Sequence, residues 1–261
     1  SCVGGLTVAR EIMRQIPNER IVYFGDTARV PYGSKSKDNI IKFSRQIIRF
    51  LQTENVKAIV IACNTASALA LDEMQQEFVL PILGVVKPGA KVAVETTANK
   101  RIGLIGTEAN IRSGVYTRYI KSLDDEAKVF EKACPLFVPL VEEGWLHDDI
   151  TLQVASRYLE ELKEKDIDTL IMGCTHYPLI RSTIRKVMGD KVNLVNPAYE
   201  TAIELKNLLE RDNLANKCDV DSPSSMYRFY VSDAEEKFKL FANSILPFDI
   251  TMTKQINIEN Y

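Results

Sequence analysis

Two short apolar runs, each ending in a cysteine, constrain the fold of this chain more than any other feature. Residues 58–62 precede Cys63, and residues 169–173 precede Cys174. Each run is continuous rather than alternating, which is typical of a strand buried on both faces of a parallel sheet. Parallel sheets bind ligands at the carboxyl ends of their strands, so we expect both thiols at such an edge. Two sulfur atoms facing one pocket could exchange protons with opposite sides of one carbon.

Apolar runs alternate with helix-like segments along almost the whole chain. The runs expected to form strands are residues 21–25, 58–62, 81–86, 101–105, 130–135, 169–172, 192–196 and 226–231, the last as an edge strand. The segments expected to form helices are residues 7–15, 38–53, 66–78, 90–97, 113–123, 150–163, 179–187, 198–210 and 233–244. Such alternation predicts parallel sheets covered by helices.

A weak internal repeat indicates two similar halves. Residues 20–27 resemble residues 101–107, and each segment is followed by one of the two cysteine runs. We therefore expect an α/β fold of two similar doubly wound parallel-sheet domains that face each other across an active-site cleft. Residues 1–87 with 198–261 would form the first domain, and residues 88–197 the second.

Composition argues against several classes of protein. The 261 residues carry 33 basic and 35 acidic side chains, without the basic stripe of a nucleic-acid-binding protein. No apolar run is long enough to span a bilayer. The five cysteines are scattered and form no CxxC pair, which argues against a disulfide framework and favours a reducing cytoplasm. Gly4 and Gly5 precede a helix with no strand before them, so the sequence is expected to start inside a structural unit.

The residues around the two strand-end cysteines could carry chemistry. Each cysteine precedes a predicted helix, whose N-terminal N–H groups would lower the pKa of a thiol from about 8.5. His176, two residues after Cys174, could pair with that thiol as an imidazolium. Small hydrogen-bonding residues gather at the strand ends and suit a small anionic substrate. They are Ser1, Tyr32, Gly33, Asn64, Thr65, Ser67, Thr107 and Thr175.

Other interpretations of these residues are weaker. Cys134 and Cys218 lack the strand-end context and are expected to be structural, and His147 is expected at the surface. Arg181 lies one position too late after Cys174 for the loop of a cysteine phosphatase. No zinc spacing that we know matches the set of Cys63, His147, Cys174 and His176.

The chain resembles the bacterial glutamate racemases at these motifs, in an order and spacing that cover nearly its whole length. The matching segments are residues 3–6, 25–27, 31–33, 62–67, 105–107, 138–142 and 173–178. Ser67 and His176 are similar to the glutamate branch of the family rather than to its aspartate branch.

This resemblance implies a cofactor-independent racemase that interconverts L- and D-glutamate. Cys63 would deprotonate D-glutamate and Cys174 would deprotonate L-glutamate, with His176 and Glu142 assisting near Cys174. The residues that would bind the substrate are Ser1, Tyr32, Gly33, Asn64, Thr65, Thr107 and Thr175. The resemblance also implies a cytoplasmic homodimer with no metal, membrane or nucleic-acid partner, whose D-glutamate supplies peptidoglycan synthesis.

The chain departs from the family pattern at three places. The family opens with Asp-Ser-Gly, whereas Cys2 replaces the glycine here and the Asp either lies before residue 1 or is missing. Asn110 replaces a second threonine, and Asn196 with Pro197 replaces an Asp-Ser pair. A glutamate-binding protein of weak catalytic activity and an aspartate-type racemase therefore stay open as alternatives.

Overall fold

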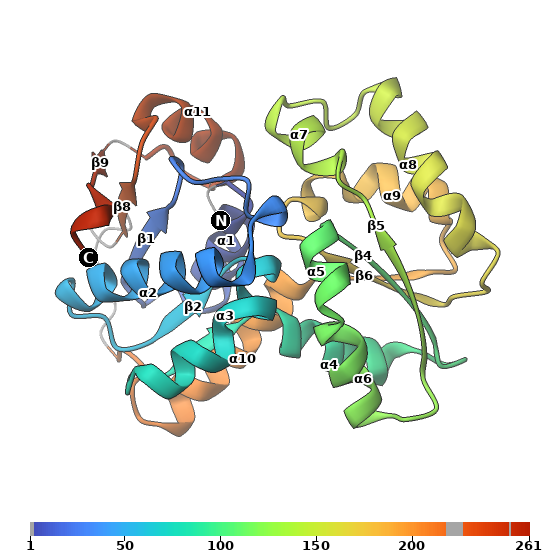
Figure 1. The fold of residues 1–261 in the computed structure, drawn as a ribbon, viewed down its shortest axis with the longest axis horizontal. Helices are drawn as coiled ribbons and strands as arrows, with labels where there is room; N and C mark the ends of the chain where they lie inside the picture. Colours follow the sequence, from blue (N-terminus) through green and yellow to red (C-terminus); the bar gives the residue numbers. More distant parts are fainter. Residues whose placement is uncertain (1–2, 218–226, 251) are drawn as a thin grey trace.

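The computed structural model describes residues 3–217, 227–250 and 252–261. It has two α/β halves that lie side by side (Figure 1). The half built on strands β1, β2, β3, β8 and β9 is called the first half below, and the half built on β4 to β7 the second half. Parallel strands form both halves, which confirms the expected α/β class with two similar parts. The exact division at residues 87/88 and 197/198 stays a prediction.

The second half has one four-stranded parallel sheet in the order β5-β4-β6-β7. Its strands are β4 (Arg101–Gly106), β5 (Lys128–Ala133), β6 (Thr169–Gly173) and β7 (Asn193–Val195). Its helices are α4 (Val86–Thr96), α5 (Glu108–Ser113), α6 (Val115–Leu123), α7 (Phe137–Glu142), α8 (Asp149–Lys163) and α9 (Arg181–Met188), with the 3₁₀ turn η2 (Tyr177–Ile180) before α9. Because β4 and β6 are paired in parallel, their last residues Gly106 and Gly173 lie opposite each other at one edge.

Helices cover both faces of this sheet, which explains the continuous apolar run of β6. Leu170 and Met172 pack on one face against α7, α8 and α9. Ile171 packs on the other face against α4 and α6. All five residues of β6 are buried, because neither face of the strand meets water.

In the first half, the parallel strands form two separate ladders among the described residues. One ladder has the order β1-β8-β9, from β1 (Ile21–Gly25), β8 (Tyr227–Val231) and β9 (Thr253–Gln255). The other pairs β2 (Ile59–Ile61) with β3 (Ile82–Gly84). A cavity of about 520 Å³ lies between β1 and β2 and extends to Cys63.

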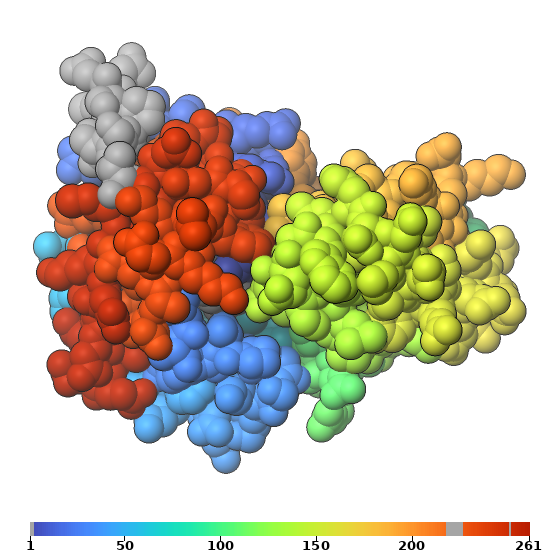
Figure 2. Space-filling view, turned by 90° about the horizontal axis from the view of Figure 1, so that it is seen from above, coloured from blue at the N-terminus to red at the C-terminus, as the bar shows by residue number. Residues whose placement is uncertain are grey.

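Helices and short turns complete the first half. They are α1 (Gly5–Gln15), η1 (Tyr32–Ser34), α2 (Lys37–Thr53), α3 (Asn64–Glu77), α10 (Pro197–Arg211), α11 (Glu235–Ile245) and η4 (Ile258–Asn260). Phe241 of α11 packs against the apolar clusters of both halves. In the space-filling view, the red C-terminal surface accordingly abuts the yellow-green surface of the second half (Figure 2).

Three expectations about the elements were wrong or incomplete. Residues 227–231 are not an edge strand, because the short polar strand β9 pairs on their outer side. The helix expected at 113–123 is interrupted at Gly114, whose φ of 62° separates α5 from α6. Helix α4 begins at Val86 and contains Pro88 in its first turn, where a missing N–H costs no hydrogen bond. The loop expected at 212–225 lies partly outside the described residues.

Within the described residues, every helix is too short or too polar to cross a membrane.

Candidate active site

Cys63 lies at the junction of β2 and α3. Its backbone is extended, and its sulfur accepts a hydrogen bond from the backbone N–H of Ala66 at 3.5 Å, so the thiol takes the place of a serine at the helix N-cap. The side chain is buried. The sulfur therefore lies at the positive end of α3, where a negative charge is stabilised.

Cys174 follows β6 and begins a chain of three interacting groups. Its sulfur lies 3.7 Å from Nδ1 of His176, and Nε2 of His176 lies 3.1 Å from a carboxylate oxygen of Glu142. Glu142 is the last residue of α7. When Nε2–H donates a hydrogen bond to this carboxylate, the neutral imidazole carries no proton on Nδ1. Nδ1 can then accept a proton from the sulfur.

The pKa of the Cys174 thiol is raised from 9.0 to about 12. Burial is the largest cause, and the negative charges of Cys63 and Glu142 add to it, although a hydrogen bond from the backbone N–H of His176 lowers the value. The expectation that a helix N-terminus lowers the pKa of this thiol was therefore wrong. A 3₁₀ turn separates Cys174 from α9, so desolvation is not offset by an α-helix start.

The start of α1, in the first half, packs tightly against the loop that carries Cys174. A Cβ atom on Gly4 would lie 2.4 Å from Oγ1 of Thr175 and 2.5 Å from Nδ1 of His176, so only glycine fits. The hydroxyl of Thr7 lies 2.8 Å from both the carbonyl of Gly4 and the carbonyl of Thr175. These contacts connect the two halves directly beside Cys174.

Small polar residues of the two halves also meet near the start of α3. The hydroxyls of Thr65 and Thr107 lie 2.9 Å apart. The hydroxyl of Tyr116, on α6, donates to Oδ1 of Asn64 at 2.6 Å. A Cβ on Gly33 would lie 3.1 Å from the Cβ of Thr107, so this loop also contacts the second half.

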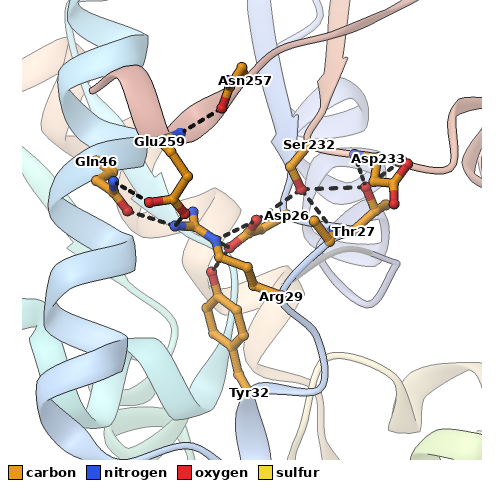
Figure 3. Close-up of polar contacts among 10 residues, drawn as sticks. Asp26, Thr27, Arg29, Tyr32, Gln46, Ser232, Asp233, Asn257 and Glu259 are labelled. Atoms are coloured by element: carbon orange, nitrogen blue, oxygen red, sulfur yellow. Dashed lines mark hydrogen bonds and ion pairs between the residues drawn. The ribbon is translucent and has the colours of Figure 1, made fainter.

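Tyr32 takes part in a buried polar network (Figure 3). Its hydroxyl donates to the carboxylate of Asp26, which also accepts from Nε of Arg29 and from the hydroxyl of Ser232 at 2.9 Å. Burial raises the pKa of Tyr32, and the charge of Asp26 raises it further. Arg29 also donates to Gln46 at 2.6 Å, so the Tyr32 loop is connected to α2.

Ser1, Cys2 and Cys218 lie outside the described residues. Cys134 is fully buried in the core of the second half, and His147 is exposed, both as expected. The described part of the chain contains no group of three or more His, Cys, Asp or Glu side chains that could hold a metal ion.

Sequence reasoning missed two residues that complete the candidate site. Asp26 lies within residues 25–27, one of the segments that resemble the family, but its contact with Tyr32 depends on the fold. Tyr116 occupies an apolar position of a helix and gave no signal that distinguishes it from a core residue. Asn110, which replaces a family threonine, donates to the carbonyl of Gly173 at 2.8 Å and so connects the ends of β4 and β6.

Sequence comparisons identify relatives that match nearly the whole chain. The sequence profile of the Asp/Glu/hydantoin racemase family matches residues 5–203. A glutamate racemase of Geobacter metallireducens is 42% identical over 259 residues, which cover 99% of this chain and 95% of the relative. A glutamate racemase of Oceanobacillus iheyensis is 41% identical over 262 residues, which cover 99% of this chain and 94% of the relative.

Solved structures of glutamate racemases share the fold of this chain. A glutamate racemase isoform of Bacillus anthracis superimposes with a TM-score of 0.93 at 38% identity, covering 98% of this chain and 94% of that one. The glutamate racemase of Francisella tularensis, solved in complex with D-glutamate, has a TM-score of 0.92 at 37% identity, covering 100% and 96%.

The fold and its full-length relatives define an enzyme of the isomerase class, a racemase. The chain belongs to the Asp/Glu/hydantoin racemase family.

Proposed function

We propose that the protein interconverts L- and D-glutamate by proton transfer at Cα between two thiols, without a cofactor. One observation carries the proposal: the loops that carry the two thiols meet at the start of α1. A Cβ on Gly4 would lie 2.4 Å from Oγ1 of Thr175, which follows Cys174, and a Cβ on Gly5 would lie 3.3 Å from the carbonyl oxygen of Ala62, which precedes Cys63. The names of the full-length relatives support glutamate as the substrate. The Francisella tularensis enzyme, of closely similar fold, was solved with D-glutamate.

In the proposed reaction, one thiolate removes the Cα proton and the opposite thiol returns a proton from the other face. The configuration inverts, and one proton leaves the carbon for each that is returned. Cys63 acts on D-glutamate and Cys174 on L-glutamate. The raised pKa of Cys174 favours its thiol form, so Cys174 is ready to protonate the carbanion formed from D-glutamate.

The reverse direction requires Cys174 to lose its proton first. Nδ1 of His176 lies 3.7 Å from the sulfur and can accept this proton. Glu142 then stabilises the imidazolium through its contact with Nε2. His176 and Glu142 therefore offset the cost of forming a buried thiolate on the L-glutamate side.

Hydrogen-bond donors at the strand ends would hold the substrate. Backbone N–H groups at a helix start, together with hydroxyl and amide groups, bind carboxylates well. The residues proposed for this role are Ser1, Tyr32, Gly33, Asn64, Thr65, Thr107 and Thr175. Both thiols must stay reduced, which suits a cytoplasmic enzyme whose D-glutamate supplies peptidoglycan synthesis. A homodimer stays a prediction.

The experiment follows proton exchange at Cα by NMR in heavy water, separately from L- and from D-glutamate. The wild type should exchange Cα hydrogen for deuterium and racemise both enantiomers. Cys63→Ser and Cys174→Ser should each abolish net racemisation, whereas Cys134→Ala, which removes a buried thiol elsewhere, should retain it. Turnover that survives either serine substitution would refute the two-thiol mechanism.

Two parallel measurements test the alternatives. Aspartate is supplied in place of glutamate, and faster turnover of aspartate would favour an aspartate-type racemase. Calorimetry measures glutamate binding, and tight binding without any exchange would favour a binding protein of weak activity.

A further inference from the structure

The side-chain amide of Asn64 is only half satisfied. Asn64 is buried, and its Oδ1 accepts from the hydroxyl of Tyr116 at 2.6 Å. Its Nδ2 is also buried and has no hydrogen-bond partner among the described residues. Buried amide donors are rarely left unpaired in native proteins, so a missing partner indicates that another molecule supplies the acceptor.

Tyr116 is held rigidly where it meets Asn64. Its ring is 1% exposed and packs with Ala90, Ile102 and Leu104 in the core of the second half. Burial raises the pKa of Tyr116 far above its ordinary value, so the hydroxyl keeps its proton and acts as a donor. A fixed donor selects the oxygen end of the carboxamide and directs the NH₂ group away from itself.

We propose that Tyr116 is a positioning residue that orients the carboxamide of Asn64, so that Nδ2 donates to a carboxylate oxygen of the bound amino acid. This inference rests on the proposed function, because it assigns one contact to the proposed substrate. Asn64 directly follows Cys63 at the start of α3, so the amide donor and the thiol that acts on Cα come from the same end of one helix. A donor to this carboxylate also stabilises the negative charge that spreads onto it when Cα is deprotonated.

The contact also couples substrate binding to the docking of the two halves. Asn64 begins α3 in the first half, whereas Tyr116 belongs to α6 in the second. The amide is therefore oriented only when α3 and α6 lie together. If the hydroxyl is removed, the amide can rotate and present its oxygen to the substrate carboxylate, which repels it.

The experiment is a double-mutant cycle of Tyr116→Phe and Asn64→Ala, with KM, kcat and the calorimetric Kd for glutamate as readouts. Tyr116→Phe alone should raise KM and Kd about tenfold, the cost of one charged hydrogen bond, and change kcat less than threefold. In the Asn64→Ala background, Tyr116→Phe should leave KM and Kd unchanged, because its effect acts through the missing amide.

Tyr119→Phe is the matched control, because Tyr119 lies on the same helix and is only partly buried. It should leave KM and Kd at the wild-type values. The same tenfold rise in KM and Kd in both backgrounds, or no rise in either, would overturn the positioning role of Tyr116. If the wild type binds glutamate without racemising it, only the proposed function is refuted. The double-mutant cycle measured by the calorimetric Kd still decides the role of Tyr116. A wild type that neither binds nor racemises glutamate overturns both.

Discussion

Replacing Gly4 with alanine tests the geometry beside Cys174 most directly. The backbone of Gly4 has φ −58° and ψ −32°, which alanine adopts without strain. By itself the substitution should stabilise the protein by about 0.4–1 kcal/mol, because alanine restricts the unfolded chain. The added methyl group, however, would lie 2.4 Å from Oγ1 of Thr175 and 2.5 Å from Nδ1 of His176, about 1 Å short of an ordinary contact of 3.4 Å in each case.

The buried side chains of Thr175 and His176 must both move to accommodate the methyl group. A shift of about 1 Å in a catalytic group costs on the order of 100-fold in rate. We therefore expect Gly4→Ala to lower kcat about 100-fold when L-glutamate is the substrate, since His176 must take the proton of Cys174 in that direction. The assay is the initial rate of Cα exchange in heavy water from each enantiomer, with thermal unfolding as the check on folding.

A second background separates the local clash from a general disturbance. In a protein with both Thr175→Ala and His176→Ala the two clashing groups are absent, and Gly4→Ala should reduce the remaining rate much less than in the wild type. A Gly4→Ala protein that exchanges L-glutamate within threefold of the wild type would show that the start of α1 does not constrain His176.

Two further predictions concern stability. The Cys174 thiol has a pKa of about 12 in the folded protein and near 9.0 in the unfolded chain. Its contribution to the free energy of unfolding is therefore complete below pH 9 and is lost as the pH rises to 12. Cys174→Ser should therefore show a smaller fall in melting temperature between about pH 8 and pH 11 than the wild type; equal falls would contradict the raised pKa. Arg29→Met leaves the buried carboxylate of Asp26 without its cation and should lower the free energy of unfolding by about 3–5 kcal/mol in chemical denaturation. Arg211→Met, which breaks an exposed pair with Asp212, should leave that free energy unchanged, and equal losses would mean that burial of the Asp26 pair is unimportant.

The sequence predicted the second half better than the first, for a physical reason. Strand β6 is buried on both faces, so every one of its residues had to be apolar or small, and the run was visible. Strand β9 has the sequence Thr-Lys-Gln, and its existence depends only on pairing with β8. Without β9, the segment 226–231 was interpreted as an edge strand.

The candidate site was predictable to the extent that its residues follow strand ends. Cys63 and Cys174 both end apolar runs, and their neighbours in sequence are their neighbours in space. The role of Glu142 came only from the family resemblance, because Glu142 lies 34 residues before the His176 that it contacts, and only the fold brings the two together. The predicted direction of the Cys174 pKa shift was wrong, because burial outweighs the effect of a helix end and cannot be predicted from local sequence.

The hydrogen bonds that join α3 to the second half have a consequence for the behaviour of the protein in salt. The Thr65–Thr107 and Asn64–Tyr116 contacts are made by uncharged groups. Across the part of the chain that the structure describes, each ion pair found stays within its own half. Mobile counterions screen charges but leave neutral contacts almost unaffected. Changes in ionic strength should therefore leave the attachment of α3 to the second half nearly constant, in dilute buffer as in a concentrated electrolyte.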